Sequence, residues 1–487
     1  MRTQMLAGLV CFLLICTSPA ALGVESGPPT QIGTSDVDRS IDVRYTVERE
    51  PNRTGRVRVT ATIERPQHVT GLSVRTPAAT TVRRADGLRP DGDRWRISDD
   101  TGTARLTYTV PVGLSTTFGQ RTADTDNWTL LARQEVSLRA RWRWHVGPRP
   151  TWNESLALAP GQDGVAGSTA AYIGPHETET RTVNGDRITL VIPAAADMRP
   201  NRTTALDSIS HAKRASTAGT DHDHIRVFVA PNDLAPGGYT PSNGESDVIV
   251  NAGEPVRSPV NVWVHEYRHT RQTFETAPAM DWLSEGSADY HTAALTYSAG
   301  GIDEARFRDR ITTERHETAD LTQPDSWDGP GAQYHKGTRV VAAIDARVQR
   351  STDGGRTFET VLDRLTRQDE RITLELFAET VSAVAGDDLD AFVRQAVTGT
   401  APSVQTDALT GRDLRRSGAA DTTSRRTNAA LSVDGPAATA TNAADEGRDG
   451  VDTARPVTDR HGEWTVLGTL GVLSVLLIRR QQRRERL

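Results

Sequence analysis

Cysteine is scarce in this chain. Its 487 residues include two, Cys11 and Cys16, and both lie in an apolar N-terminal segment. Arg2 precedes this segment and small residues follow it, which is the pattern of a secretory signal peptide over residues 1–24. An uncleaved anchor is disfavoured because the apolar run is short. A processed protein would therefore contain no cysteine, which excludes disulfide bonds and thiolate metal ligands.

Lysine is also scarce. Lys213 and Lys336 are the two lysines among 57 basic residues, and all the others are arginines. We interpret this imbalance as genomic composition rather than as an indication of chemistry. Hydrophobic residues make up 36% of the chain and charged residues 25%, as in ordinary soluble domains. The length is sufficient for two folded domains with tethering segments.

The residues between the two ends of the chain have no excess of positive charge. The formal net charge is −6, although the N-terminal leader carries +1 and residues 479–487 carry +4. Without these two ends the remaining residues carry −11. Nucleic-acid binding requires a concentrated basic face, so we expect no nucleic-acid partner.

The C-terminal region lacks large apolar side chains until near its end. Residues 401–462 are rich in Ala, Thr, Asp, Arg and Gly, which predicts a disordered stalk. Residues 464–478 then contain no charge, and residues 480–487 form a basic tail. This pattern predicts a transmembrane helix over residues 463–479 with a cytoplasmic tail.

As a helix, the uncharged run would extend roughly 22 Å, somewhat short of a bilayer core of about 30 Å. An amphipathic or buried helix is disfavoured by the arginines that follow the run. The alternative of a sorting signal that is later removed stays open. We expect an exported, cell-surface protein with a single membrane anchor.

Asn-x-Ser/Thr triplets occur four times in the part expected to lie outside the cell. Each triplet alone is a weak signal, because such sequences arise often by chance. Their positions are consistent with an exported glycoprotein. The four asparagines are Asn52, Asn127, Asn153 and Asn201.

The N-terminal half has the alternation typical of β-strands. After a flexible lead over residues 25–40, apolar and polar residues alternate in short runs separated by turn residues. This spacing predicts an all-β sandwich over residues 41–150. No cluster of catalytic residue types is visible in it, so we expect a structural role.

The second half mixes strands and helices. Residues 188–192, 225–229 and 247–251 have the composition of buried strands, and a helix is expected to begin near Asn201. Helical patterns dominate from residue 260, for example over residues 340–348 and 358–365. We therefore predict an α+β, mainly helical catalytic domain over residues 185–400.

The segment at residues 265–269 reads His-Glu-x-x-His. Two residues four positions apart lie on one face of a helix, so His265 and His269 can direct ring nitrogens at one ion. Glu266 then lies beside the ion, near enough to take a proton from water. Arg268 and Arg271 are expected to face solvent on the far side of this helix.

A second acidic segment follows at residues 281–290. Catalytic zinc prefers three protein ligands and one open position, and Glu285 can supply the third ligand from the next helix. Asp289 lies one turn further and is expected to accept the other ring N–H of a ligand histidine. We therefore predict one Zn²⁺ per chain.

These segments resemble the motifs of the gluzincin zinc metallopeptidases of the MA clan. Residues 282–286, Trp-Leu-Ser-Glu-Gly, are similar to a motif of the aminopeptidase N group, the glycyl aminopeptidases and the peptidase MA-like domains. The resemblance covers roughly residues 225–400. It implies a thermolysin-like catalytic domain in which the two histidines and Glu285 bind zinc and Glu266 is the general base.

A third motif, at residues 333–337, is similar to the Tyr-x-Lys-Gly element of the aminopeptidase N relatives. In those proteins the tyrosine donates a hydrogen bond to the developing oxyanion, so the resemblance implies this role for Tyr334. A phenol is a suitable donor to a charge that develops only in the transition state. The alternative is a half-buried core tyrosine.

The sequence departs from the aminopeptidases at one position. Their glycine-rich element upstream of the helix carries a glutamate that binds the substrate's amino group. Its local counterpart contains Gly237 and Gly238, and Thr240 stands where the glutamate would be. A neutral hydroxyl does not hold an ammonium group as a carboxylate does. The sequence thus leaves open whether cleavage is at the N-terminus or internal.

We therefore predict a zinc metallopeptidase that hydrolyses peptide or protein substrates. The alternative is a catalytically silent surface-binding protein that keeps a peptidase-like shell, and Glu266 disfavours it because a scaffold has no use for the base. A purely structural zinc site is also disfavoured, since such sites close with a fourth protein ligand. The physiological substrate and the oligomeric state are not indicated.

Overall fold

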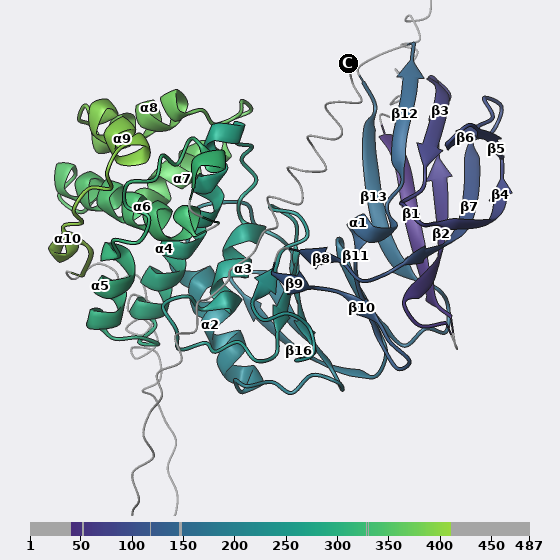
Figure 1. Ribbon diagram of the computed structural model, residues 1–487, viewed down its shortest axis with the longest axis horizontal. Coiled ribbons are helices and arrows are strands. Elements are labelled where there is room, and N and C mark those ends of the chain that lie inside the picture. Colours follow the sequence, from purple (N-terminus) through teal and green to yellow (C-terminus); the bar gives the residue numbers. More distant parts are fainter. Residues whose placement is uncertain are drawn as a thin grey trace, which may run out of the picture.

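The computed structural model describes residues 40–410, except residues 51–52, 117, 146–148, 328 and 330. Figure 1 shows the strands of the N-terminal part at one end, helices at the other, and further strands between them. The predicted signal peptide, transmembrane helix and basic tail lie outside the described residues, together with most of the predicted lead and stalk. Within the described part, no helix combines the length and apolar content needed to cross a bilayer.

The N-terminal part contains two sheets packed face to face. One has the strand order β13-β1-β2-β7-β4 and the other β12-β3-β6-β5. Side chains alternate between core and surface along β1, which buries Ile41, Val43, Tyr45 and Val47. Their bounds are β1 Ser40–Arg49, β2 Arg56–Glu64, β3 Val69–Arg75, β4 Thr81–Asp86, β5 Leu88–Asp91, β6 Arg94–Ile97, β7 Thr103–Pro111, β12 Arg139–Trp144 and β13 Thr151–Leu158.

The strands of this part continue past residue 150, where the sequence analysis ended the sandwich. Strand β13 runs parallel to β1 and forms the edge of its sheet. The hydroxyl of Tyr45 on β1 donates a hydrogen bond of 2.6 Å to Glu154 on β13. The sandwich therefore needs β13, and the boundary at 150 is too early.

A third sheet joins the sandwich to the rest of the chain, with the order β10-β11-β15-β14. The buried carboxylate of Asp247 accepts backbone N–H groups of Thr169 at 2.6 Å and Ala170 at 3.2 Å. This contact ties the third sheet to the central one. The bounds of these elements are β8 Ser115–Thr116, β9 Gly119–Gln120, β10 Ala123–Asp124, β11 Thr129–Ala132, α1 Arg133–Val136, β14 Gly164–Ala166 and β15 Ala170–Ile173.

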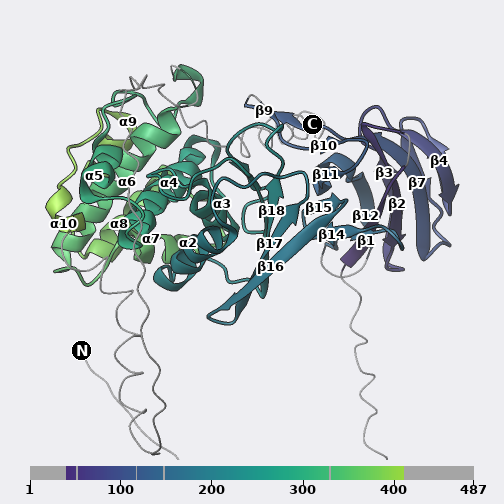
Figure 2. The ribbon, with the colours of Figure 1, turned by 90° about the horizontal axis from the view of Figure 1, so that it is seen from below.

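The central sheet has the order β16-β17-β18-β20-β19. Strands β17, β18 and β20 are parallel, whereas β16 and β19 are antiparallel edges. Figure 2 shows α2 and α3 beside this sheet. The three strands and the helix expected here are confirmed. Their bounds are β16 His176–Val183, β17 Asp186–Pro193, α2 Arg202–Ala215, β18 His224–Ala230, β19 Gly238–Tyr239 and β20 Asp247–Asn251.

The rest of the described chain is helical, as expected. Every residue of α3 is buried, and so are all residues of α4 except its last, because other elements pack around both helices. The α-helices are α3 Val262–Thr270, α4 Trp282–Ser298, α5 Glu304–Thr312, α6 Ala332–Ser351, α7 Phe358–Thr366, α8 Leu374–Ala385, α9 Asp390–Thr398 and α10 Thr406–Thr410. Two short 3₁₀ helices span Pro278–Met280 and Pro324–Ser326.

The first ten residues of the predicted stalk are folded, so its start at residue 401 is wrong. Ala401 donates its backbone N–H to the carbonyl of Glu317 at 2.8 Å. Leu409 on α10 is buried in the helical core. One large apolar residue therefore extends the packed region, although the composition of the wider segment is that of a stalk.

Lys336 on α6 caps the end of α9. Its buried ammonium donates to the carbonyls of Ala319 at 2.5 Å, Val397 at 3.1 Å and Gly399. The last carbonyls of a helix have no partner within the helix, and a basic side chain satisfies them. Burial lowers the pKa of Lys336 to about 8.

We expect Lys336→Met to destabilise the helical part by about 3 kcal/mol, because three carbonyls lose a hydrogen bond from a charged donor. In a region of this size that corresponds to a melting temperature lower by roughly 5–10 °C. Thermal unfolding followed by circular dichroism measures it. Arg350→Met, an exposed position on the same helix, is the control, and equal melting temperatures for both variants would contradict the capping role.

Candidate metal centre and active site

Helix α3 presents three polar side chains in a buried environment. His265 is 6% exposed, Glu266 is fully buried and His269 is 2% exposed. The helix begins after Asn261, whose backbone carbonyl accepts the N–H of His265 at 3.0 Å. The spacing of four residues directs both imidazoles to one side, as the sequence predicted. Their ring centroids are 4.7 Å apart.

Glu285, in the first turn of α4, completes a cluster with the two histidines. Its Oε2 lies 3.2 Å from Nε2 of His265 and 3.3 Å from Nε2 of His269. The two Nε2 atoms are 3.1 Å apart. Within the described residues this is the group of His, Cys, Asp and Glu side chains positioned to hold a metal ion.

These separations fit zinc. Ligand atoms at about 2.0–2.1 Å from a tetrahedral ion lie about 3.3 Å from one another. The triangle of 3.1, 3.2 and 3.3 Å has the size of one tetrahedral face. Two imidazoles and one carboxylate leave a fourth position open, which is the ligand set of catalytic rather than structural zinc. The residues present therefore fit the predicted ion.

The charges of the cluster favour a cation. Burial disfavours the imidazolium of His269, but the Glu285 carboxylate outweighs it and the pKa of His269 rises to about 9. Burial also opposes ionisation of Glu285, yet the two imidazoles lower its pKa to about 2. A buried carboxylate that stays ionised is a strong ligand for a positive ion.

Gln272 orients His269, a role that the sequence analysis did not assign. Nδ1 of His269 and Oε1 of Gln272 are 2.8 Å apart. The amide of Gln272 also donates to the carbonyl of Ser284 at 2.9 Å and to the hydroxyl of Ser287 at 3.1 Å. This residue therefore fixes the ring of His269 and links the end of α3 to α4. Its position three residues after His269 was the available signal.

Asp289 lies beside the cluster but does not form the expected hydrogen bond. Its Oδ1 is 4.0 Å from Nδ1 of His265, which is beyond hydrogen-bond distance. Its Oδ2 accepts the hydroxyl of Thr338 at 2.9 Å and pairs with Arg310. The carboxylate thus connects α4 to α5 and α6 near His265.

Arg268 and Arg271 do not face solvent, so that expectation is wrong. They are 1% and 2% exposed. Arg268 pairs with Glu359 at 3.3 Å, and Arg271 pairs with Asp221 at 2.9 Å. The far side of α3 is covered by the segment before β18 and by α7, so both guanidinium groups anchor the helix instead.

Thr240 and Gly238 surround Glu266. The Thr240 hydroxyl donates to Oε2 of Glu266 at 2.7 Å. A Cβ atom on Gly238 would lie 2.6 Å from Oε1 of Glu266, so only glycine fits there. Gly237 precedes this pair, and its N–H donates to Glu254 at 2.6 Å. The edge strand β19 therefore passes directly over the carboxylate.

Tyr334 on α6 faces the same site. Its ring centroid lies 6.2 Å from that of His265. Helices α4 and α6 approach closely where Gly286 meets Gly337, since a Cβ on Gly286 would lie 2.9 Å from the Gly337 backbone. Burial, then the charge of Glu285, raises the pKa of Tyr334 well above its ordinary value. The phenol therefore stays protonated and can donate a hydrogen bond.

Known structures share this fold. An aminopeptidase N family protein from Idiomarina loihiensis matches with a TM-score of 0.51 and 13% identity over 76% of this chain and 77% of that one. An M1 zinc metallopeptidase from Deinococcus radiodurans matches with a TM-score of 0.51 and 13% identity over 75% of this chain and 94% of that one. The chain has a gluzincin aminopeptidase-like fold. By sequence, no family model and no curated relative matches it.

The structure shows what the side chain of Thr240 contacts. The expected counterpart of the amine-binding glutamate is Thr240, and its side chain is engaged with Glu266 rather than directed toward a substrate. The position expected to carry the amine-binding carboxylate therefore carries a hydroxyl that is bonded to Glu266.

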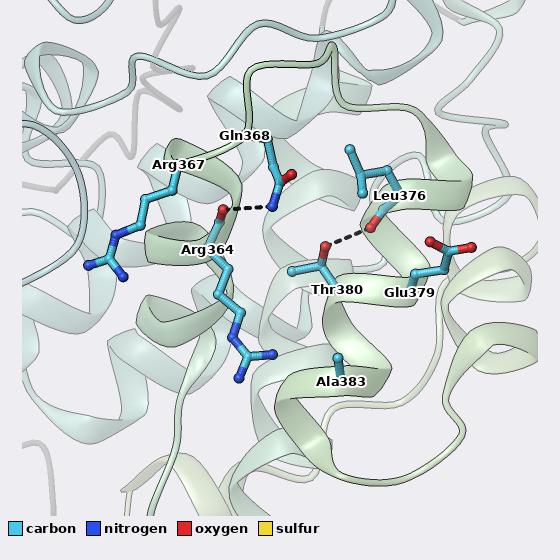
Figure 3. A pocket seen from close by; sticks show the side chains of 7 residues that line it. All are labelled: Arg364, Arg367, Gln368, Leu376, Glu379, Thr380 and Ala383. Carbon is cyan, nitrogen blue, oxygen red and sulfur yellow. Dashed lines mark hydrogen bonds between the residues drawn. The ribbon is translucent and has the colours of Figure 1, made fainter. Parts of the chain in front are cut away.

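A second hollow lies on the surface between α7 and α8 (Figure 3). Two of its polar groups bond to the backbone of their own helix segment: Thr380 donates to the Leu376 carbonyl at 2.7 Å, and Gln368 to the Arg364 carbonyl at 3.3 Å. It contains none of the residues of the metal cluster. The remaining lining residues are Arg367, Glu379 and Ala383. We assign it no chemistry.

We expect the purified chain to bind one equivalent of zinc, and Glu285→Ala to lose it, because two imidazoles alone hold the ion poorly. Metal analysis after dialysis, with melting curves before and after chelation, measures both. Glu275→Ala, an exposed acidic position between α3 and α4, is the control. Unchanged zinc content in Glu285→Ala would remove Glu285 from the ligand set.

Proposed function

We propose that this protein is a zinc metallopeptidase that hydrolyses peptide bonds. The observation that carries the proposal is the triangle of Nε2, Nε2 and Oε2 atoms with edges of 3.1 to 3.3 Å, next to the buried carboxylate of Glu266. An open fourth position beside a carboxylate that can act as a base is the arrangement that metal-assisted hydrolysis requires.

Bound zinc would polarise the scissile carbonyl and make the attacking water more acidic. Glu266 accepts the proton of that water and delivers it to the leaving amine. The hydrogen bond from Thr240 holds one oxygen of Glu266 in place. Tyr334, kept protonated by its surroundings, donates a hydrogen bond to the oxyanion as negative charge develops.

Strand β19 is a suitable platform for an extended peptide. It lies at the edge of the central sheet and pairs with β20 through Gly238 and Tyr239. An unpaired strand edge can add a peptide by backbone hydrogen bonds. A substituted form of the Deinococcus radiodurans metallopeptidase, with a TM-score of 0.50, was solved with a Tyr-Ser-Ala substrate bound, which supports a peptide as the ligand of this fold.

The proposal includes a location outside the cytoplasm. The predicted signal peptide over residues 1–24 and the apolar run over residues 464–478 support an exported peptidase tethered by its C-terminal helix. The distribution of a tagged chain between culture medium and membrane fraction tests this part independently of catalysis.

We expect Glu266→Gln to keep its zinc and to lose turnover by roughly a hundredfold to ten-thousandfold, because the amide cannot accept the proton. Single-turnover cleavage of a defined peptide mixture, followed by mass spectrometry, measures the loss. Glu275→Gln serves as the matched control. Wild-type turnover in Glu266→Gln would reject Glu266 as the base.

Tyr334→Phe is expected to reduce kcat roughly a hundredfold to a thousandfold with little change in KM, because the phenol acts only on the transition state. Tyr297→Phe is the matched control, since Tyr297 is also a buried tyrosine but belongs to the core between α4 and α5. A kcat equal to that of the wild type would return Tyr334 to a packing role.

A further inference from the structure

Arg121 is a buried cation with unused donors. It is 3% exposed and lies between β9 and β10, in the N-terminal part of the chain. Its Nη1 donates to the carbonyl of Pro236 at 2.7 Å. Its Nε and Nη2 are buried and have no hydrogen-bond partner among the described residues. Buried polar groups are nearly always paired, so this exception calls for an explanation.

The backbone holds Arg121 rigidly. Its N–H donates to the carbonyl of Leu114 at 2.7 Å, and the preceding carbonyl of Gln120 accepts the N–H of Ala235 at 2.9 Å. The half-buried Glu135 accepts the hydroxyl of Thr122 and the N–H of Leu114, both at 2.9 Å. The backbone around Arg121 is therefore fixed, which holds the guanidinium in one place.

Arg121 lies beside the segment that covers Glu266, and its Nε and Nη2 form a free edge. The carbonyl of Pro236 accepts the hydrogen bond from Nη1, and Pro236 directly precedes the glycines that cover Glu266. The carboxylates of Glu266 and Glu254 are near enough to attract the guanidinium. Neither of them makes a hydrogen bond with Nε or Nη2. A residue of the β-rich part thus lies near Glu266, in contact with the segment that precedes strand β19.

The chemistry of the free edge indicates its ligand. Nε and Nη2 form one side of the planar guanidinium and donate two parallel N–H groups. This fork matches the two oxygens of one carboxylate, and such bidentate pairs are among the strongest hydrogen bonds in proteins. An ammonium group would be repelled. The absence of a carboxylate at position 240 removes the group that would attract it.

We propose that Arg121 binds a carboxylate of the substrate, so that the peptidase prefers acidic peptides over peptides that offer a free amino group at this point. The inference rests on the proposed function and adds its substrate class. Two sources supply the same chemistry: the C-terminal carboxylate of a short peptide, and the side chain of an Asp or Glu near the scissile bond.

The test compares matched peptides with the zinc-loaded full chain. In one arm, N-acetylated peptides end in a free carboxylate or in an amide. In the other, Asp and Glu next to the cleaved bond are exchanged for Asn and Gln. We expect a preference of roughly tenfold to a hundredfold in kcat/KM for the carboxylate in one arm, mainly through KM. The arm that shows it identifies the source.

Arg121→Gln should abolish this preference. Because the variant also loses the hydrogen bond from Nη1 to the Pro236 carbonyl, the preference is measured as the ratio of carboxylate to amide rates within each variant. Arg121→Lys should restore part of it, because an ammonium keeps the charge without the planar fork. Arg89→Gln, at an exposed arginine of β5, is the matched control. Melting curves identify a variant that fails to fold, and Arg121→Lys then decides alone.

Equal rates for carboxylate and amide peptides in both arms would overturn the proposal, as would a preference that survives in Arg121→Gln. If the zinc-loaded chain cleaves no peptide, the proposed function fails instead. Calorimetric binding of the same peptide pairs to wild type and Arg121→Gln then still decides on Arg121: a carboxylate-dependent affinity lost in the variant supports it, and equal affinities reject it.

Discussion

The meeting of His265, His269 and Glu285 at one point is the constraint on which the rest depends. Three buried polar groups within 3.3 Å of one another are costly unless a cation joins them. Two helices must therefore be held in fixed register. Gln272 links their backbones near the site, and the contact of Gly286 with Gly337 sets α6 against α4. Glu266 and Tyr334 reach the cluster only because these helices are fixed.

The β-rich part makes direct hydrogen bonds with the strands that lie next to the metal cluster. Asp247 binds two backbone N–H groups of the third sheet, and Gln134 bonds to the hydroxyl of Tyr239 on β19. Arg121 reaches the same strand through Pro236. The structural role expected for this part thus includes contacts with the segment that lies over Glu266.

The two lysines have a physical explanation that composition does not provide. Lys336 donates to three carbonyls, and Lys213 pairs with Asp186 at 2.5 Å and with Asp221 at 2.6 Å; both are buried. A compact ammonium fits between several acceptors, whereas a guanidinium is planar and larger. The general preference for arginine reflects the composition of the chain, whereas Lys213 and Lys336 occupy sites whose geometry suits an ammonium group.

The sequence by itself determined the local features: the helix with two histidines four residues apart, the acidic residue on the next helix, the strands at 188–192 and 247–251, and alternation in the N-terminal part. These follow from periodicity and ligand chemistry, which act over a few residues. Only the tertiary structure decided that Asp289 pairs with Arg310, that Gln272 orients His269, that Arg268 is buried, and that two donors of the buried Arg121 have no hydrogen-bond partner among the described residues. Such contacts join residues distant in sequence, and no local pattern encodes which partner a long polar side chain meets.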